Sequence, residues 1–205
     1  MDFTNKLAEL FSRFPGIGQR QAKRFVFFLL SQDPSFVENL ILQISNLKKI
    51  TSTCQSCSRF FFGKDAKEKL CSICRDAKRE NILMIVCREI DLENVEKSGI
   101  FSGKYFVLGG NIPILDKEPY KKVRMKKMLE KVENLAKIGE LREVIIATDF
   151  NPEGENTAIF VKKELMPVSK KYKFKISSLG KGLSLGTELE YSDPETIKNA
   201  LVNRV

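Results

Sequence analysis

The sequence has no histidine and no tryptophan among its 205 residues. The lack of imidazole excludes Ser-His-Asp triads, Cys-His pairs and metal sites with histidine ligands. No apolar run approaches the roughly 18 residues that a membrane helix needs, and Phe25–Leu30 is among the longest. The start, Met1–Lys6, lacks the basic-then-apolar layout of a secretory signal. These absences predict a protein of the reducing cytosol with no membrane segment.

Acidic residues are outnumbered by basic ones, with 26 Asp and Glu against 35 Lys and Arg and a net charge of +9. Residues 1–80 carry 14 basic and 8 acidic side chains, whereas residues 81–205 carry 21 and 18. Net positive charge favours a polyanionic partner, first of all nucleic acid. Because many basic proteins bind no nucleic acid, the charge indicates only where such contacts are to be sought, in the first 80 residues.

Residues 1–50 show helical spacing of apolar side chains in three segments. The first two are separated by the turn Phe14-Pro15-Gly16-Ile17-Gly18. The third begins at Asp33-Pro34, where a capping residue precedes proline. Residues 51–80 have a different character, with paired cysteines and many charges. The pattern predicts a helical domain followed by a small cysteine-containing module.

Residues 81–178 alternate helical patterns with short, continuously apolar runs, at 82–86, 105–108 and 144–147. Such runs are typical of buried parallel strands, so the predicted fold class is α/β, with a parallel sheet and crossover helices. Residues 179–205 are glycine-rich at first. They continue with a strand-like segment, 187–191, and a terminal helix that begins near Asp193-Pro194.

The strongest motif is a pair of Cys-x-x-Cys knuckles, formed by Cys54, Cys57, Cys71 and Cys74. Four thiolates at this spacing can bind one tetrahedral Zn²⁺ and leave no open position for water, so the site is predicted to be structural, with one zinc per chain. The alternatives are buried unpaired cysteines or an iron–sulfur cluster. Cys87 stands apart in an apolar run and is interpreted as a small core residue.

The second motif is Pro15-Gly16-Ile17-Gly18, followed by Arg20, Lys23 and Arg24. Gly16 and Gly18 let the backbone turn tightly and bring N–H groups and a helix N-terminus close to an anion. Arg20 and Arg24 share one helical face and can contact adjacent phosphates. The layout is that of a helix-hairpin-helix motif that grips the DNA backbone without reading sequence. A plain helical hairpin, with glycines that serve only the turn, is the alternative.

The third motif, Ala147–Glu155, follows an apolar strand and contains Asp149, Glu153 and Glu155. Carboxylates at the C-terminal end of a parallel strand can hold Mg²⁺ near a phosphate. Glu153 and Glu155 are equally consistent with capping of the next helix. The residues alone leave both interpretations open.

Two weaker features complete the survey. Residues 117–131 contain seven basic side chains, up to Lys131, and are interpreted as a solvated helix face that adds to an electrostatic path for DNA. Leu179-Gly180-Lys181-Gly182 is not a phosphate-binding P-loop, because Lys175 replaces the preceding glycine and no Ser or Thr follows Lys181. No ATP or GTP binding is therefore predicted.

The order of these motifs resembles the RecR family of bacterial recombination mediators from end to end. The stretches that carry the resemblance are Phe14–Gly18 with Ala22, the four paired cysteines, Phe101–Leu108, Ala147-Thr148 with Glu153-Gly154-Glu155, and Gly182–Tyr191. The hairpin alone is a common motif, but the set is specific.

The resemblance implies four parts: a helix-hairpin-helix domain (1–50), a four-cysteine zinc finger (51–80), a Toprim domain (81–178) and a C-terminal oligomerisation segment (179–205). It implies homodimers or ring-shaped homotetramers that encircle DNA in the cytoplasm, associated with the nucleoid. It also implies action with RecO, and often RecF, in loading the recombinase at single-stranded gaps and junctions.

By position, the resemblance makes Arg20 and Arg24 DNA contacts, and it makes the acidic Toprim residues a surface for RecO. Two departures stand out. The loop between the cysteine pairs is longer than is usual in the family. Cys87 occupies the position of the usual strand-end glutamate, and Asn151 replaces an aspartate two residues after Asp149.

A two-metal phosphoryl-transfer centre needs several carboxylates, and Cys87 and Asn151 stand where two of them are expected. The sequence is therefore interpreted as a non-enzymatic DNA-binding factor of recombinational repair. One alternative is a Mg²⁺-dependent Toprim nuclease or primase-like enzyme that uses Asp149, Glu153 and Glu89. Another is a scaffold that binds only protein partners.

Overall fold

The computed structural model describes residues 3–63, 68–115, 118–183, 186 and 188–202. The chain forms two compact units, residues 1–51 and residues 52–205. The described residues include no helix long and apolar enough to cross a bilayer.

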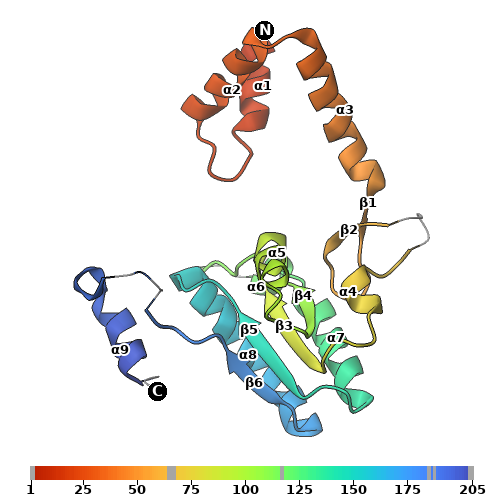
Figure 1. The fold of residues 1–205 in the computed structure, drawn as a ribbon, viewed down its shortest axis with the longest axis vertical. Coiled ribbons are helices and arrows are strands. Elements are labelled where there is room, and N and C mark those ends of the chain that lie inside the picture. Colours follow the sequence, from red (N-terminus) through yellow and green to blue (C-terminus); the bar gives the residue numbers. More distant parts are fainter. Residues whose placement is uncertain (1–2, 64–67, 116–117, 184–185, 187, 203–205) are drawn as a thin grey trace. The chain divides into compact units, whose positions relative to one another are not determined.

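The first unit consists of three helices, which confirms the predicted helical pattern: α1 (Phe3–Phe11), α2 (Gln19–Ser31) and α3 (Pro34–Ile50) (Figure 1). Helices α1 and α2 pack around the buried side chains of Ala8, Ala22 and Val26. Asp33 caps α3, because its carboxylate accepts a hydrogen bond of 3.0 Å from the backbone N–H of Phe36. Among the described residues, none of α3 is buried.

The second unit is built on a four-stranded parallel sheet in the order β4-β3-β5-β6. The strands are β3 (Ile82–Val86), β4 (Lys104–Val107), β5 (Glu143–Ala147) and β6 (Lys175–Ser178). The apolar runs correctly predicted the first three. Strand β6 has only one apolar residue and lies at the sheet edge, so it lacked the continuous apolar pattern of a buried strand.

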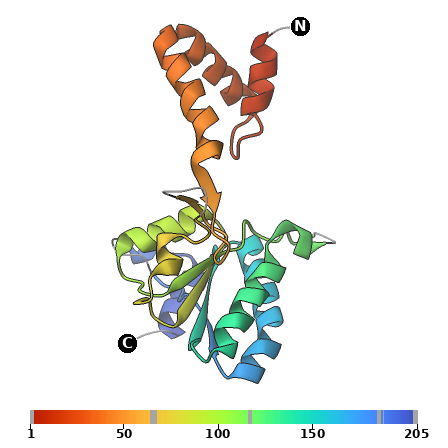
Figure 2. The ribbon, with the colours of Figure 1, turned by 90° about the vertical axis from the view of Figure 1, so that its right-hand side faces the viewer.

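Both faces of the sheet are covered, as the near-continuous apolar strands require. Leu83 and Ile85 point to a core formed with helices α7 (Met125–Lys137) and α8 (Pro152–Tyr172). The alternate residues Met84 and Val86 point to a second core, which contains Leu92 of α5 (Glu89–Ser98). Figure 2 shows α7 and α8 side by side against the sheet, with α5 on the other side. The short helix α6 spans Pro119–Lys122.

The C-terminal segment differs from the prediction. Instead of a strand over 187–191, Leu189–Tyr191 forms a short 3₁₀ helix, η1, while Thr187 lies outside the described residues. A strand needs a neighbour for its backbone hydrogen bonds, and the pairings within the described ranges place none beside this segment. Helix α9 (Pro194–Val202) follows, and Asp193 accepts hydrogen bonds from its first turn, as the Asp-Pro pair predicted.

Gly154 provides a test of how tightly α8 approaches β5. A Cβ at this position would lie 2.8 Å from the carbonyl carbon of Asp149 and closer still to its oxygen. We expect Gly154→Ala to lower the free energy of unfolding by about 2 kcal/mol or more, because backbone must move to admit the methyl group. Denaturant unfolding measures the loss.

Gly180→Ala is the matched control, because no atom of the residues that the structure describes lies within 4 Å of a Cβ added there. It should change stability by less than about 0.5 kcal/mol. Equal effects of the two substitutions would contradict the close approach of α8 to Asp149.

Candidate metal centre and nucleic-acid interface

The four paired cysteines converge at one point. Their sulfur atoms all lie within 4.8 Å of one another, and Cys57 Sγ is 3.6 Å from Cys71 Sγ. Sulfurs bound tetrahedrally at about 2.3 Å from one ion are about 3.8 Å apart. Cys54, Cys57 and Cys71 are at most 1% exposed. The donor set and its spacing fit a tetrahedral metal ion with no position left for a substrate.

Three short elements build the cysteine module, which comprises the described residues of the range 51–75. Strands β1 (Thr51–Thr53) and β2 (Phe60–Phe62) pair around the first knuckle, and α4 (Ser72–Arg75) begins directly after Cys71. The backbone N–H of Cys71 lies 3.4 Å from Cys54 Sγ, which joins the second knuckle to the first. Residues 64–67 of the longer loop lie outside the described residues.

The module shares its apolar core with the sheet. Phe61 and Ile73 pack in the same buried cluster as Met84 and Tyr105. The carbonyl of Cys57 also accepts a 2.9 Å hydrogen bond from Val107 N–H on the edge strand β4. The cysteines therefore lie at a junction between the module and the parallel sheet, a position that the motif spacing alone did not predict.

Lys131 is buried, although the sequence predicted that it would be solvent-exposed. The basic run was predicted to be a solvated face, and Lys126 and Lys127 are indeed exposed, but Lys131 is only 8% exposed. It falls on the buried stripe of α7, three residues after Met128. That spacing is the signal that could have identified it.

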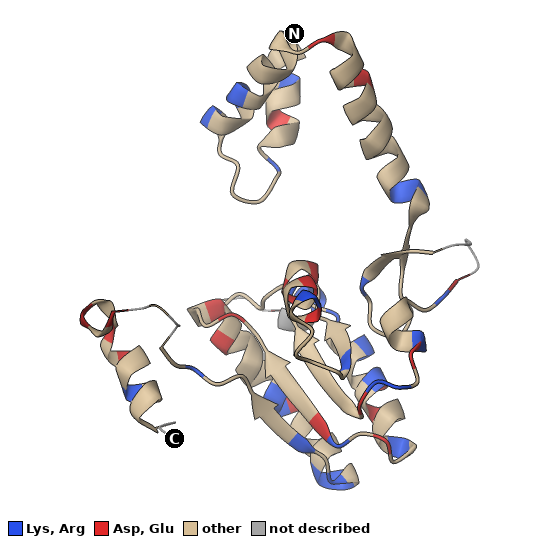
Figure 3. Cartoon of the chain, in the orientation of Figure 1, with Lys and Arg blue, Asp and Glu red and all other residues tan. Residues whose placement is uncertain are grey.

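The predicted DNA-contacting residues lie together in the hairpin between α1 and α2. Gly16 has a φ of +78°, a left-handed conformation that favours glycine. Gly18 precedes α2, whose first turn has no side-chain cap and no acidic residue. Arg20, Lys23 and Arg24 are exposed on the helix that follows, and Figure 3 marks the basic segments of α1 and α2. This end of α2 has the N–H groups and positive charge that anion binding requires.

Asp149 lies at the C-terminal end of β5 but is already paired within the chain. The Arg88 guanidinium lies 3.0 and 3.1 Å from its two carboxylate oxygens, and the Asn111 amide donates to it at 3.0 Å. Arg88 also contacts Asp91, which accepts a 2.8 Å hydrogen bond from the Arg88 backbone N–H. A cationic side chain thus occupies the strand end where the sequence analysis considered carboxylates that hold Mg²⁺.

The other acidic residues do not join Asp149 in a metal site. Glu153 is exposed, and Glu155 forms an ion pair with Lys181. Glu89 instead accepts a 2.9 Å hydrogen bond from Phe60 N–H in the cysteine module. Among the described residues, only the four cysteines form a cluster of three or more potential metal ligands.

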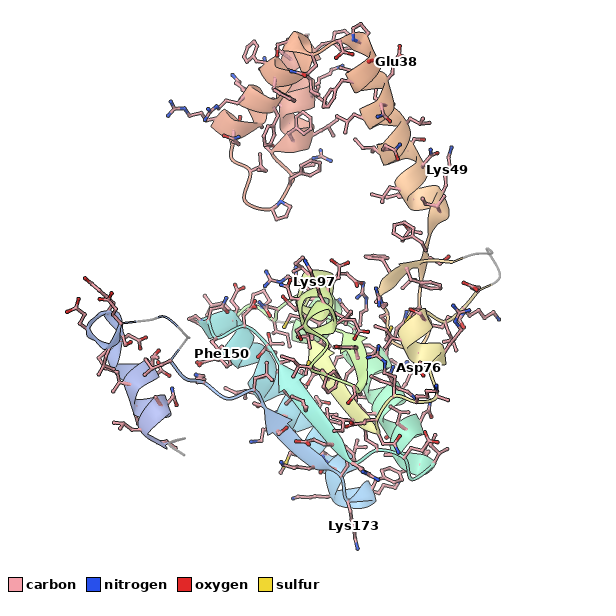
Figure 4. The ribbon with its side chains drawn as sticks, viewed as in Figure 1. Glu38, Lys49, Asp76, Lys97, Phe150 and Lys173 are labelled. Atoms are coloured by element: carbon pink, nitrogen blue, oxygen red, sulfur yellow. The ribbon has the colours of Figure 1, made fainter. Side chains whose placement is uncertain are left out.

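Phe150, labelled in Figure 4, follows Asp149 and is 57% exposed.

Cys87 is fully buried at the position of the expected glutamate. Burial raises the pKa of its thiol to about 12, with the nearby Asp149 carboxylate as a further cause. The side chain is therefore a neutral thiol at physiological pH. This agrees with its interpretation as a core residue.

Comparison with known families now defines the class of protein. A Toprim domain model matches residues 81–179, and models of the RecR helix-hairpin-helix and the RecR C-terminal segment match residues 4–47 and 182–205. The chain is thus a Toprim protein that carries a helix-hairpin-helix.

Full-length relatives identify the family. The recombination protein RecR of Dehalococcoides mccartyi is 32% identical over 98% of this chain and 92% of the relative. RecR of Streptomyces avermitilis is 32% identical over 97% of this chain and 94% of its own, and that of Tropheryma whipplei 34% over 94% and 91%. The chain belongs to the RecR family of recombination proteins, which confirms the resemblance.

Glu89 gives a pH-dependent test of the junction. Burial raises the pKa of its carboxyl, against the lowering effect of the Phe60 N–H. A raised folded-state pKa favours folding while the group is protonated, and this contribution is lost as pH rises through the folded pKa. Glu89→Gln keeps an acceptor for the Phe60 N–H but has no carboxyl to ionise. We therefore expect its free energy of unfolding to rise relative to that of the native chain as the pH increases from acidic to neutral.

Denaturant unfolding of both proteins from pH 4 to pH 8 measures this difference. Glu38→Gln, at an exposed position of α3, is the control for the loss of one carboxylate. A stability difference between Glu89→Gln and the native chain that does not change with pH would contradict the buried carboxyl.

Proposed function

We propose that the protein is a non-enzymatic DNA-binding factor of recombinational repair. It acts with RecO, and with RecF where present, to load the recombinase at single-stranded gaps and duplex junctions. Membership of the RecR family supports this assignment. The observation that carries it is the hairpin, where an uncapped helix start lies beside three exposed basic side chains.

The hairpin suits contact with phosphates rather than bases. Backbone N–H groups of Gly16, Gly18 and the first turn of α2 recognise an anion without regard to sequence. Arg20 and Arg24 add charge on the same side of the helix. Each hairpin makes few contacts, so a ring of several subunits would raise affinity by increasing effective concentration.

The arrangement around Asp149, at the C-terminal end of β5, supports a role without catalysis. Two-metal phosphoryl transfer needs carboxylates that converge on both ions. Here Asp149 is neutralised by Arg88, and Glu89 points to the cysteine module. We assign Asp149, Glu153 and Glu155 instead to a surface for RecO, in the cytoplasm and close to the nucleoid.

Zinc is the metal that we propose for the four cysteines. A tetrahedral set of four thiolates is typical of structural zinc, although iron–sulfur proteins use the same ligands. When bound, zinc supplies folding free energy to a module with few apolar residues of its own. The cysteines hold the ion, and Phe61 and Ile73 attach the module to the sheet.

Assembly into homodimers or ring-shaped homotetramers is also proposed. Apolar side chains on α3 are more than half exposed, including Ile41, Ile44 and Leu47. The first unit also has an apolar groove of about 750 Å³ whose walls include Leu7, Leu10 and Leu30. Exposed apolar area of this kind favours self-association.

DNA binding provides the first test of the proposal. Replacing both Arg20 and Arg24 by Ala should weaken binding to gapped DNA of mixed sequence, because two phosphate contacts are lost per hairpin. The slope of log affinity against log salt should become shallower by about 2 for each engaged hairpin. Fluorescence anisotropy over a range of salt concentrations, with and without RecO, measures both effects.

The charge-matched control replaces Lys162 and Lys163, which are exposed on α8, and should leave most of the affinity. Equal losses for the two double variants would reject the hairpin as the contact. Cleavage of the DNA in Mg²⁺, abolished by Asp149→Ala, would favour the enzymatic alternative.

Metal content provides the second test. The purified protein should contain about one zinc ion per chain, and Cys57→Ser should lose it, whereas Cys87→Ala should keep it. Chelation should lower the unfolding temperature of the native chain because the metal stabilises the folded module. Elemental analysis and thermal unfolding measure these outcomes. A metal-free preparation that unfolds at the same temperature would exclude a structural metal.

A further inference from the structure

Lys131 is a buried lysine directly beside the proposed metal centre. It comes from α7, on the Toprim side of the junction, and is 8% exposed. Burial of an ammonium group is costly unless its charge and all its N–H groups are compensated. No carboxylate of the described residues is recorded within ion-pair distance of it, so a conventional salt bridge is not the reason for its position.

Three acceptors surround the ammonium, which has three N–H groups. Its Nζ lies 3.0 Å from Ser56 Oγ, 3.2 Å from the carbonyl oxygen of Tyr105 and 3.8 Å from Cys74 Sγ. Ser56 lies within the first knuckle and Cys74 within the second. Lys131 therefore contacts both halves of the cysteine module and strand β4 at once.

The charge of the metal centre explains why a cation is needed there. Four thiolates and one divalent ion carry a net charge of −2, which is unfavourable in a buried site without a compensating positive charge. The backbone N–H of Cys71, which donates to Cys54 Sγ, is neutral and cannot supply that charge. Outer groups that donate to metal ligands orient them and tune the affinity of the site.

We propose that Lys131 is a positioning residue of the metal centre: it compensates the thiolate charge and fixes Cys74 as a ligand. This inference depends on the proposal that the four cysteines bind zinc. Its consequence is that the affinity for the metal is set partly by the Toprim helix α7 and not by the module alone.

The test compares Lys131→Met, Lys131→Arg and Lys126→Met in the full-length protein. Lys131→Met keeps the apolar stem and removes the charge, and Lys126 is an exposed residue of the same helix. Zinc affinity is measured by competition with a chromophoric chelator. Lys131→Met should weaken zinc binding by about 10- to 100-fold, Lys131→Arg should recover much of it, and Lys126→Met should bind as the native chain does.

Cobalt substitution gives a readout that a loss of packing alone would not produce. The thiolate-to-cobalt absorption band should shift in Lys131→Met and return towards its native position in Lys131→Arg. Native zinc affinity and an unchanged cobalt spectrum in Lys131→Met, even with lower stability, would overturn the role of Lys131. A native chain that binds no zinc would instead reject the metal assignment itself.

Discussion

The structure depends on the burial of the four-cysteine cluster against the second face of the Toprim sheet. A module of this size has too little apolar surface to fold alone. Further apolar contacts come from Met84, Val86 and Tyr105 of the sheet, which share the core of the module. The sheet benefits in turn, because Cys57 pairs with the edge strand β4 and leaves less of that edge open. The proposed metal coordination and the stability of the sheet therefore depend on the same packed unit.

The same junction extends to Asp149 at the C-terminal end of β5. Glu89 turns towards the backbone of Phe60, while its neighbour Arg88 turns towards Asp149. Adjacent side chains at the start of α5 thus fix the cysteine module on one side and neutralise the strand-end acid on the other. The hairpin that we propose for DNA binding lies in a separate unit. The proposed DNA contacts and the Arg88–Asp149 pair therefore belong to different parts of the chain.

Features with a local pattern could be predicted from the sequence. The knuckles, the Asp33 cap, the glycine hairpin and three strands all have signals within a few residues. Features set by tertiary contacts could not be predicted in this way. Lys131 resembled any basic residue of a solvated helix until its neighbours in the fold were known, and the Arg88–Asp149 pair joins residues 61 positions apart. Strand β6 and η1 depend on which backbone groups have partners nearby.

The Arg88–Asp149 pair constrains how this chain can change over generations. Loss of Arg88 alone leaves the partly buried Asp149 carboxylate without its counter-ion, whereas Arg88 is 54% exposed and is solvated when Asp149 is lost. A change at position 88 is therefore expected to be accompanied by a change at position 149. A glutamate at position 87 would place a carboxylate beside this pair, and cation-dependent chemistry at this end of the sheet would first require the loss of Arg88.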